Sequence, residues 1–326
     1  MPESEWVSAH IFRHQDPDPL LAGPIAGLLA QLTECGAIDS YFFLRYWEGG
    51  PHVRLRMRVA RPGAEATIRR LTVSACADFM AANPGEPQLS DSEYAALAPT
   101  LAAAERMTDF DRRLRTADSI DFIEYRPDHR RFGSGEALAH AEQHLAEASA
   151  LALAMIGIGR SPSQRAGDAF AMLVANRLLR TRAEDEVAAD ARRIAADWGG
   201  ELILNTAAFE DHYAATRDGL VSIVESVRTA TERAGASRPW ERWLRSADRL
   251  RSALVALDRQ GRLDADWSAL TGASTLAALD PAGPELVLEH CAHLMCNRLG
   301  IAPSQEMHLR ALVARATADS VASRSR

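Results

Sequence analysis

The most informative stretch of this 326-residue sequence is YFFLRYWEGGPHVRLRMR, residues 41–58. Its second half alternates apolar residues with arginine, which is typical of a β-strand that has one apolar and one polar face. The preceding Glu48–Pro51 contains a glycine pair and a proline, residues that are common where a chain reverses. The stretch therefore predicts a β-hairpin whose second strand presents Arg54, Arg56 and Arg58 on one face.

This arginine row has two interpretations. A guanidinium group is permanently charged and offers a planar fork of donors that suits carboxylates, so the row is able to hold an acidic substrate or to stabilise an oxyanion. The alternative is an ordinary solvated strand face. The alternation alone does not decide between them.

The composition narrows the possible functions. The sequence contains no lysine, so all 37 basic residues are arginine. This excludes a Schiff-base lysine, a pyridoxal-phosphate anchor and a P-loop lysine. The formal net charge of −7 argues against broad nucleic-acid binding, although a local basic groove stays open.

The N-terminus resembles no signal peptide, and no apolar run approaches the length of a membrane span. The four cysteines form no CxxC pair, so neither a disulfide framework nor a zinc knuckle is indicated. We therefore expect a cytoplasmic protein that does not contact a membrane.

The periodicity of the chain changes near residue 135. Before it, strand patterns at 6–13 and 119–126 and the hairpin alternate with helical patterns at 19–36, 63–82 and 93–105. After it, the helical segments are 136–156, 163–179, 184–198, 209–234, 240–260, 284–299 and 304–318. We expect an α+β fold in which an N-terminal mixed sheet, with its hairpin and helices, packs against a mainly helical C-terminal lobe.

Two further segments carry candidate chemical groups. A glycine-containing loop at residues 124–135 follows a predicted strand and contains Arg126, Arg130 and Arg131, which suits either a site at a sheet end or an exposed basic loop. The helix at 284–299 carries His290 and His293 three residues apart, and either is a candidate general base, while a structural role is the alternative. His140 and His144 have a metal-binding spacing, but no third ligand is evident, and we expect no metal and no organic cofactor.

Three blocks together resemble the thiopeptide-type bacteriocin biosynthesis domain, the C-terminal elimination domain of class I lanthipeptide dehydratases. They are FFLRYWEGGPHVRLR at 42–56, YRPDHRRFG at 125–133 and HLMCNRLG at 293–300. The blocks span nearly the whole chain. We therefore expect a single elimination-type domain over residues 1–326, with an α+β half at 1–134, a helical half at 135–319 and a polar tail at 320–326.

The resemblance implies a lyase that eliminates glutamate from glutamylated Ser or Thr of a precursor peptide, which gives dehydroalanine or dehydrobutyrine. The family's catalytic residues map onto Arg54, Arg56, Arg131 and His293. Fixed cations would stabilise the enolate charge and pair with the departing carboxylate, and the histidine would move the proton. Substrate-binding residues are expected in or beside the same blocks: Arg45, Arg58, Arg126, Asn297 and Arg298.

The sequence departs from the commoner family pattern at two positions. Phe132 stands where tyrosine is usual, and Leu294 stands where methionine is common. Both changes preserve bulk and remove no charge, so elimination remains the leading expectation.

The family also contains pyridine synthases, which close two dehydroalanines by a formal [4+2] cycloaddition and release the leader peptide. That reaction is the first alternative, and a non-catalytic scaffold that binds the precursor by strand addition is the second. The partners expected are a ribosomally made precursor peptide and a separate glutamylating protein, without direct contact to nucleic acid. A homodimer is left open.

Overall fold

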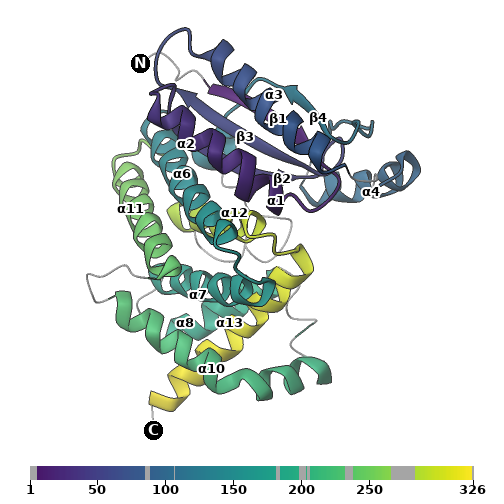
Figure 1. Ribbon diagram of the computed structural model, residues 1–326. Coiled ribbons are helices and arrows are strands. Elements are labelled where there is room, and N and C mark those ends of the chain that lie inside the picture. Colours follow the sequence, from purple (N-terminus) through teal and green to yellow (C-terminus); the bar gives the residue numbers. More distant parts are fainter. Residues whose placement is uncertain are drawn as a thin grey trace. The chain divides into compact units, whose positions relative to one another are not determined.

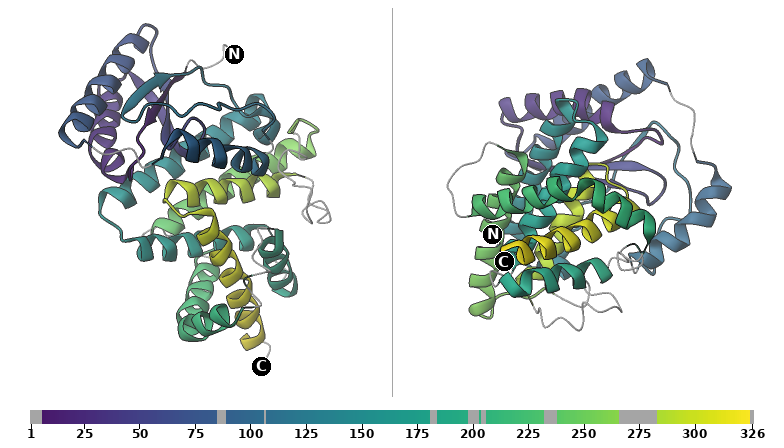
Figure 2. Two further views of the ribbon diagram at one scale, coloured as in Figure 1. Left: turned by 90° about the vertical axis from the view of Figure 1, so that its right-hand side faces the viewer. Right: turned by 90° about the horizontal axis from the view of Figure 1, so that it is seen from below.

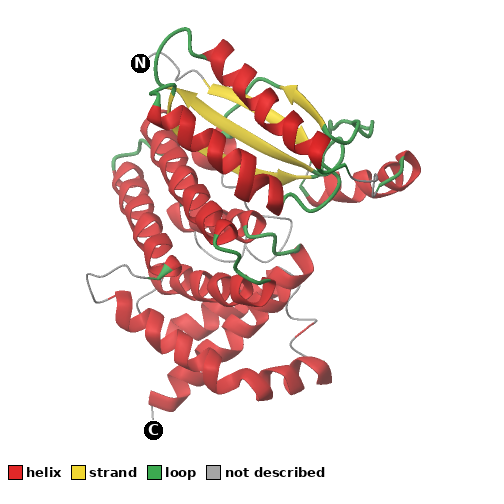
Figure 3. Cartoon of the chain, in the orientation of Figure 1, coloured by secondary structure: helices red, strands yellow, loops and turns green. Residues whose placement is uncertain are grey.

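The structure is a computed structural model that describes residues 6–84, 89–105, 107–180, 184–197, 203, 206–231, 238–265 and 283–324. The chain divides into two compact units (Figure 1). The first unit comprises Met1–Arg126 and Ala152–Gly159, and the second comprises Pro127–Leu151 and Arg160–Arg326. All four strands that the structure describes belong to the first unit (Figure 3).

The first unit combines these strands with short helical segments. In chain order its elements are β1 (Trp6–Phe12), α1 (Asp18–Leu20), the π-helix η1 (Leu21–Ile25), α2 (Ala26–Glu34), β2 (Ile38–Tyr46), β3 (His52–Val59), α3 (Glu65–Ala82), α4 (Asp91–Ala104) and β4 (Ser119–Phe122). The predicted hairpin is formed by β2 and β3. Gly49 and Gly50 both have a positive φ in its turn, where a Cβ on Gly50 would lie 2.7 Å from a methyl carbon of Leu114.

The sheet order is β2-β3-β1-β4, and all three pairings are antiparallel. The expected α+β class is confirmed, but the sheet is antiparallel where a mixed sheet was expected. A helical connection joins β1 to β2, and the hairpin then returns β3 between these two strands, so that each strand lies beside neighbours of opposite direction. This strand and helix order is that of a ferredoxin-like fold.

One face of the sheet forms the core of the first unit. Val53, Leu55 and Met57 of β3 are fully buried on this face, as the alternation predicts. Their partners on β1 are the buried residues Ile11, Ala9 and Val7, respectively. The helices α2 and α3 pack together and contact β2 and β1, respectively (Figure 1). The arginines of β3 alternate with these residues and therefore lie on the other face.

The second unit is helical. Its elements are α5 (His129–Phe132), most of α6 (Gly135–Gly157), α7 (Pro162–Arg180), α8 (Glu184–Asp197), α10 (Ala207–Thr231), α11 (Pro239–Arg259), α12 (Pro284–Arg298) and α13 (Pro303–Arg324). The predicted helices are confirmed within a few residues where the structure describes them, and the expected ends at residues 198 and 234 lie outside the described residues. No described helix is both long and apolar enough for a membrane span.

Helix α7 is the central element of this unit. It contacts α8, α10, α11, α12 and α13, and its residues 169–177 are all buried. A helix that is buried on every side needs an apolar surface all round, and the run AFAMLVA at 169–175 provides it. Two buried polar residues, Asn176 and Arg177, follow that run directly.

A polar tail was expected at 320–326. Up to Arg324 this expectation is wrong, because α13 continues to that residue. Ser320 is fully buried and bonds Glu225 of α10 at 2.5 Å, while Asp319 accepts hydrogen bonds from Tyr213 and Arg217 of the same helix. The polar end of the sequence is thus paired against α10. Helix α13 also packs along α8 (Figure 2). Residues 325–326 lie outside the described residues.

Candidate functional site

The arginine row lies on β3, in the middle of the sheet. In the β1–β3 register, Arg54 lies opposite His10, Arg56 opposite Ser8 and Arg58 opposite Trp6. On the other side, β2 places Phe42 opposite Arg56. We call this side of the sheet, with His52, Arg54, Arg56, Ser8 and His10, the arginine face.

Arg54 is held by several groups near the hairpin turn. Its Nη2 donates to Glu48 Oε2 at 2.8 Å, and its guanidinium carbon lies 3.4 Å from the centre of the Tyr46 ring. Its Nε donates to Nε2 of His52 at 3.3 Å. A guanidinium that is fixed by a carboxylate, a ring and an imidazole has a defined orientation.

Arg56 has a different environment. Its side chain is 9% exposed, and its Nε and Nη1 are buried with no hydrogen-bond partner among the described residues. The guanidinium carbon lies 5.6 Å from the ring centre of Phe42 and 5.2 Å from that of Tyr125. Burial, together with the charge of Arg54, lowers the pKa of Arg56 to about 10, so the group remains charged at neutral pH.

Two histidines on the arginine face escaped the sequence analysis. The rings of His10 and His52 stack with their centres 5.0 Å apart, and both side chains are buried. Burial and then the charge of Arg54 lower the pKa of His10 to about 2. Burial also lowers the pKa of His52 to about 3, against a hydrogen bond to the carbonyl of Gly50 that raises it, so both rings are neutral.

The sequence contains a signal for one of these two histidines. His52 has the same strand parity as Arg54 and Arg56, so it must share their face. His10 has no local signal of this kind. It becomes part of the face only because β1 pairs with β3 in the register that places it opposite Arg54.

The other expected substrate-binding residues of the first unit lie apart from Arg56. Arg45 lies opposite Val53, hence on the apolar side of the sheet, and pairs with Asp18 at 2.5 Å. Arg58 donates to Asp39 at 2.6 Å, and both side chains are substantially exposed. Arg126 is 88% exposed, with Glu124 at 4.0 Å.

The first unit also has a cavity of about 490 Å³ between α3 and β4. Its lining includes Val73, Met80, Asp118 and Ile120. Ile120 lies opposite Ile11, so the cavity is on the apolar side of the sheet and is separate from the arginine face.

In the second unit, Arg131 and His293 lie near a common group, His290. Asp128 caps the one-turn helix α5 by accepting from the backbone of Arg131, and it also pairs with the Arg131 side chain at 2.6 Å. Burial, followed by the charge of Arg131, holds the pKa of His290 well below its usual range. The rings of His290 and His293 are 6.1 Å apart, and the ring of Phe132 lies 5.7 Å from His290.

His293 is bonded to a buried carboxylate. Its Nδ1 lies 2.8 Å from Oε2 of Glu306, a residue of α13 that is 1% exposed, whereas His293 itself is 29% exposed. Burial acts to raise the pKa of Glu306, but Arg310 and His293 reverse this effect and lower it. An ionised Glu306 can only accept a hydrogen bond, so Nδ1 must carry the hydrogen, and in the neutral ring Nε2 then carries the lone pair.

The two other expected residues of α12 have dissimilar positions. Asn297 is half-buried on the helix surface. Arg298 is fully buried and donates from Nε to the hydroxyl of Ser149 at 2.9 Å. Burial lowers the pKa of Arg298 to about 10.

The structure therefore brings the expected residues together in two groups. Arg54 and Arg56 lie on the arginine face of the first unit, and Arg131 lies near His290 and His293 in the second. The meeting of these two groups in one active site stays a prediction. Among the described residues, no three His, Cys, Asp or Glu side chains are placed to hold a metal ion.

Solved structures of similar fold include three that match over nearly all of this chain. The pyridine synthase TbtD from thiomuracin biosynthesis has a TM-score of 0.76 and 22% identity, with 97% of this chain and 99% of that chain covered. TsrL has a TM-score of 0.64 and 19% identity, with 97% and 95% covered. The tRNA-dependent lantibiotic dehydratase MibB from Microbispora sp. 107891 has a TM-score of 0.51 and 16% identity, with all of this chain but 29% of that chain covered.

These structural likenesses establish the fold. No curated protein matches the sequence. A family model described as lantibiotic biosynthesis dehydratase C-term matches residues 6–317, nearly the whole chain. The chain therefore belongs to the family of lantibiotic biosynthesis dehydratase C-terminal domains.

Proposed function

We propose that this protein eliminates glutamate from glutamylated Ser or Thr residues of a ribosomally made precursor peptide. The family membership supports an enzyme that modifies such a peptide. The choice of glutamate elimination depends on one observation, the buried guanidinium of Arg56, whose Nε and Nη1 have no hydrogen-bond partner among the described residues.

A buried cation without a counter-charge is costly, and proteins normally pair it. Arg56 has two aromatic rings and another arginine as neighbours, and no described carboxylate bonds to it. Binding of a carboxylate would supply the missing charge through a bidentate pair. In the proposed reaction, that carboxylate belongs to the glutamyl group.

The elimination would proceed by loss of the Cα proton of the esterified residue to a base. The electron pair of that C–H bond becomes the Cα=Cβ double bond, and the Cβ–O bond breaks with its pair leaving on the glutamate carboxylate. Negative charge grows first on the enolate oxygen and then on the leaving group, and a fixed cation stabilises both. The proposed base is His293 through Nε2, with Arg56 and Arg131 as the cations.

Arg54 would have a different role in this scheme. Its contacts with Glu48, Tyr46 and His52 engage it within the protein. It would therefore shape the arginine face and add positive potential beside Arg56, while Arg56 would bind the anion directly.

Pyridine formation is the second candidate. It is supported by the structural likeness to the pyridine synthase TbtD, which has a TM-score of 0.76 over 97% of this chain. Cycloaddition of two dehydroalanines releases no carboxylate, so this reaction would provide no anionic leaving group for Arg56 to bind.

Mass spectrometry of two substrates separates these functions. One is a glutamylated precursor peptide, and the other is a precursor that already carries two dehydroalanines. Loss of glutamate from the first supports elimination, whereas release of the leader from the second supports pyridine formation. Binding of both peptides without any mass change would favour a scaffold and would contradict the proposal.

A further inference from the structure

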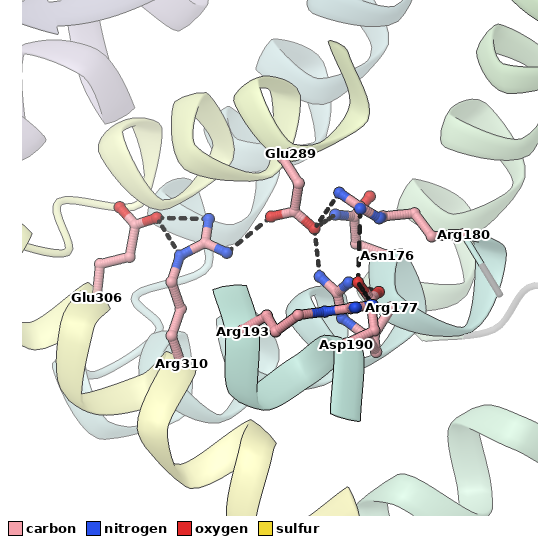
Figure 4. A network of polar contacts seen from close by, with 8 residues as sticks. All are labelled: Asn176, Arg177, Arg180, Asp190, Arg193, Glu289, Glu306 and Arg310. Carbon is pink, nitrogen blue, oxygen red and sulfur yellow. Dashed lines mark hydrogen bonds and ion pairs between the residues drawn. The ribbon is translucent and has the colours of Figure 1, made fainter. Parts of the chain in front are cut away.

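His293 is the partly exposed end of a buried ionic network that involves four helices of the second unit. Figure 4 shows the inner part of this network, from Glu306 and Arg310 of α13 through Glu289 of α12 to the polar residues of α7 and α8. The members other than His293 and Arg193 have side chains that are nearly inaccessible to solvent. The members drawn are Asn176, Arg177, Arg180, Asp190, Arg193, Glu289, Glu306 and Arg310.

The network fixes the carboxylate that faces His293. Arg310 donates from Nε to Glu306 Oε1 at 3.0 Å and from Nη1 to Glu289 Oε2 at 2.8 Å. The other oxygen of Glu289 accepts from Asn176 at 2.7 Å and from Arg177 at 2.5 Å. One oxygen of Glu306 is therefore committed to Arg310, and the other is left to face His293.

From this geometry, and on the basis of the function proposed above, we propose that Glu306 is a positioning residue. It fixes His293 as the Nδ1–H tautomer, directs Nε2 toward the substrate and supplies the counter-charge when Nε2 takes the Cα proton. Such a carboxylate beside a histidine sets both the tautomer and the ring orientation. Sequence analysis had no means of finding it, because Glu306 lies on a different helix.

Glu306→Gln tests this role in a specific way. The N–H donors of Arg310 require an acceptor, so the amide oxygen of the new side chain should face Arg310 and its NH₂ group should face His293. Nδ1 would then have to accept a hydrogen bond, and the proton would move to Nε2. The variant keeps the shape of the side chain but reverses the tautomer of the ring.

The matched control is Glu289→Gln. Glu289 has the same kind of buried environment and bonds the same arginine, but no hydrogen bond between it and His293 is part of the described network. This variant should weaken the network while His293 remains the Nδ1–H tautomer. A general loss of packing would affect both variants alike.

The measurement is the pair of ¹⁵N shifts of the His293 ring in the full-length protein, assigned by loss of the signal in His293→Gln. We expect protonated Nδ1 in the wild type and in Glu289→Gln, and protonated Nε2 in Glu306→Gln. With a glutamylated peptide, Glu306→Gln should lower kcat on the order of 10²- to 10⁴-fold and leave KM close to wild type.

A wild-type ring that carries its proton on Nε2 would overturn the inference without the need for any variant. An unchanged tautomer in folded Glu306→Gln would overturn it as well. If the tautomer reverses but glutamate is released at the wild-type rate, Glu306 still sets the tautomer, and it is the proposed role of His293 as base that fails.

Discussion

The arginine face and the ionic network both contain buried arginines, but they differ in whether these arginines are paired with carboxylates. In the network, Arg177 and Arg310 each pair with two buried carboxylates. On the arginine face, Arg56 is buried beside aromatic rings, and its Nε and Nη1 have no hydrogen-bond partner in the part of the chain that the structure describes. The paired arginines join the helices of the second unit, whereas we propose that Arg56 binds an anion. Burial alone would not have separated these two roles.

The largest effect is expected in the network, from Glu289→Ala. This change leaves Arg177 and Arg310 with one buried counter-charge fewer, and loss of one partner of a buried pair costs about 3–5 kcal/mol of unfolding free energy. Urea denaturation measures the effect. The control is Glu285→Ala on the same helix, where a partly exposed pair with Arg251 at 3.5 Å should cost about 1 kcal/mol or less. Equal losses of unfolding free energy in the two variants would mean that the buried network is no more important for stability than a partly exposed ion pair.

On the arginine face, the expected effect is on catalysis and not on stability. Arg56→Lys replaces the planar fork by a single ammonium group, so glutamate release should fall on the order of 10²- to 10³-fold. The midpoint of thermal unfolding should hardly change, because the substitution removes no hydrogen bond of Nε or Nη1 to the described residues. Normal release by this variant would assign the anion site to another residue.

A smaller effect concerns the pH dependence of stability. The pKa of His52 is about 3 in the folded chain, far below that of an exposed histidine, so the unfolded chain binds an extra proton between these two values. Stability should therefore fall as the pH drops from 7 to 5. His52→Gln should reduce this fall by about 1–2 kcal/mol, as measured by denaturation at both pH values. Parallel pH profiles for the two proteins would mean that His52 titrates normally.

The smallest effect is expected for Arg58→Lys. Arg58 lies in the same row as Arg56, but its side chain is 37% exposed and already paired with Asp39. Exposed pairs contribute about 0–1 kcal/mol, so stability and glutamate release should both remain near wild type. A large loss of activity would extend the anion site along the whole row.

The sequence predicts features that depend on local periodicity. The alternation from Val53 to Arg58 gives the strand and its two faces, and the helical spacing beyond residue 135 gives the helices of the second unit. The direction of strand pairing was not predictable in this way, because it depends on where β3 enters the sheet. The end of α13 was missed for a similar reason, since its polar residues are paired by another helix.

In the candidate site, too, the sequence predicts which residues are involved but not the role of each. Arg54, Arg56, Arg131 and His293 stand in recognisable sequence blocks, so they were found as residues. What each does depends on neighbours that are distant in sequence, such as His10 opposite Arg54 and Glu306 beside His293. Burial and pairing therefore distinguish Arg56 from Arg54, which the alternation treats as equivalent.

The position of β3 between β2 and β1 also has a consequence for the order of folding. The hairpin with β2 closes a short loop, whereas the pairing with β1 joins residues as far apart as Trp6 and Arg58. Closing a loop of that length costs more chain entropy and is generally the slower step. An early hairpin would thus display the arginines before Ser8 and His10 arrive beside them. The proposed anion site would then be among the last parts of the first unit to form.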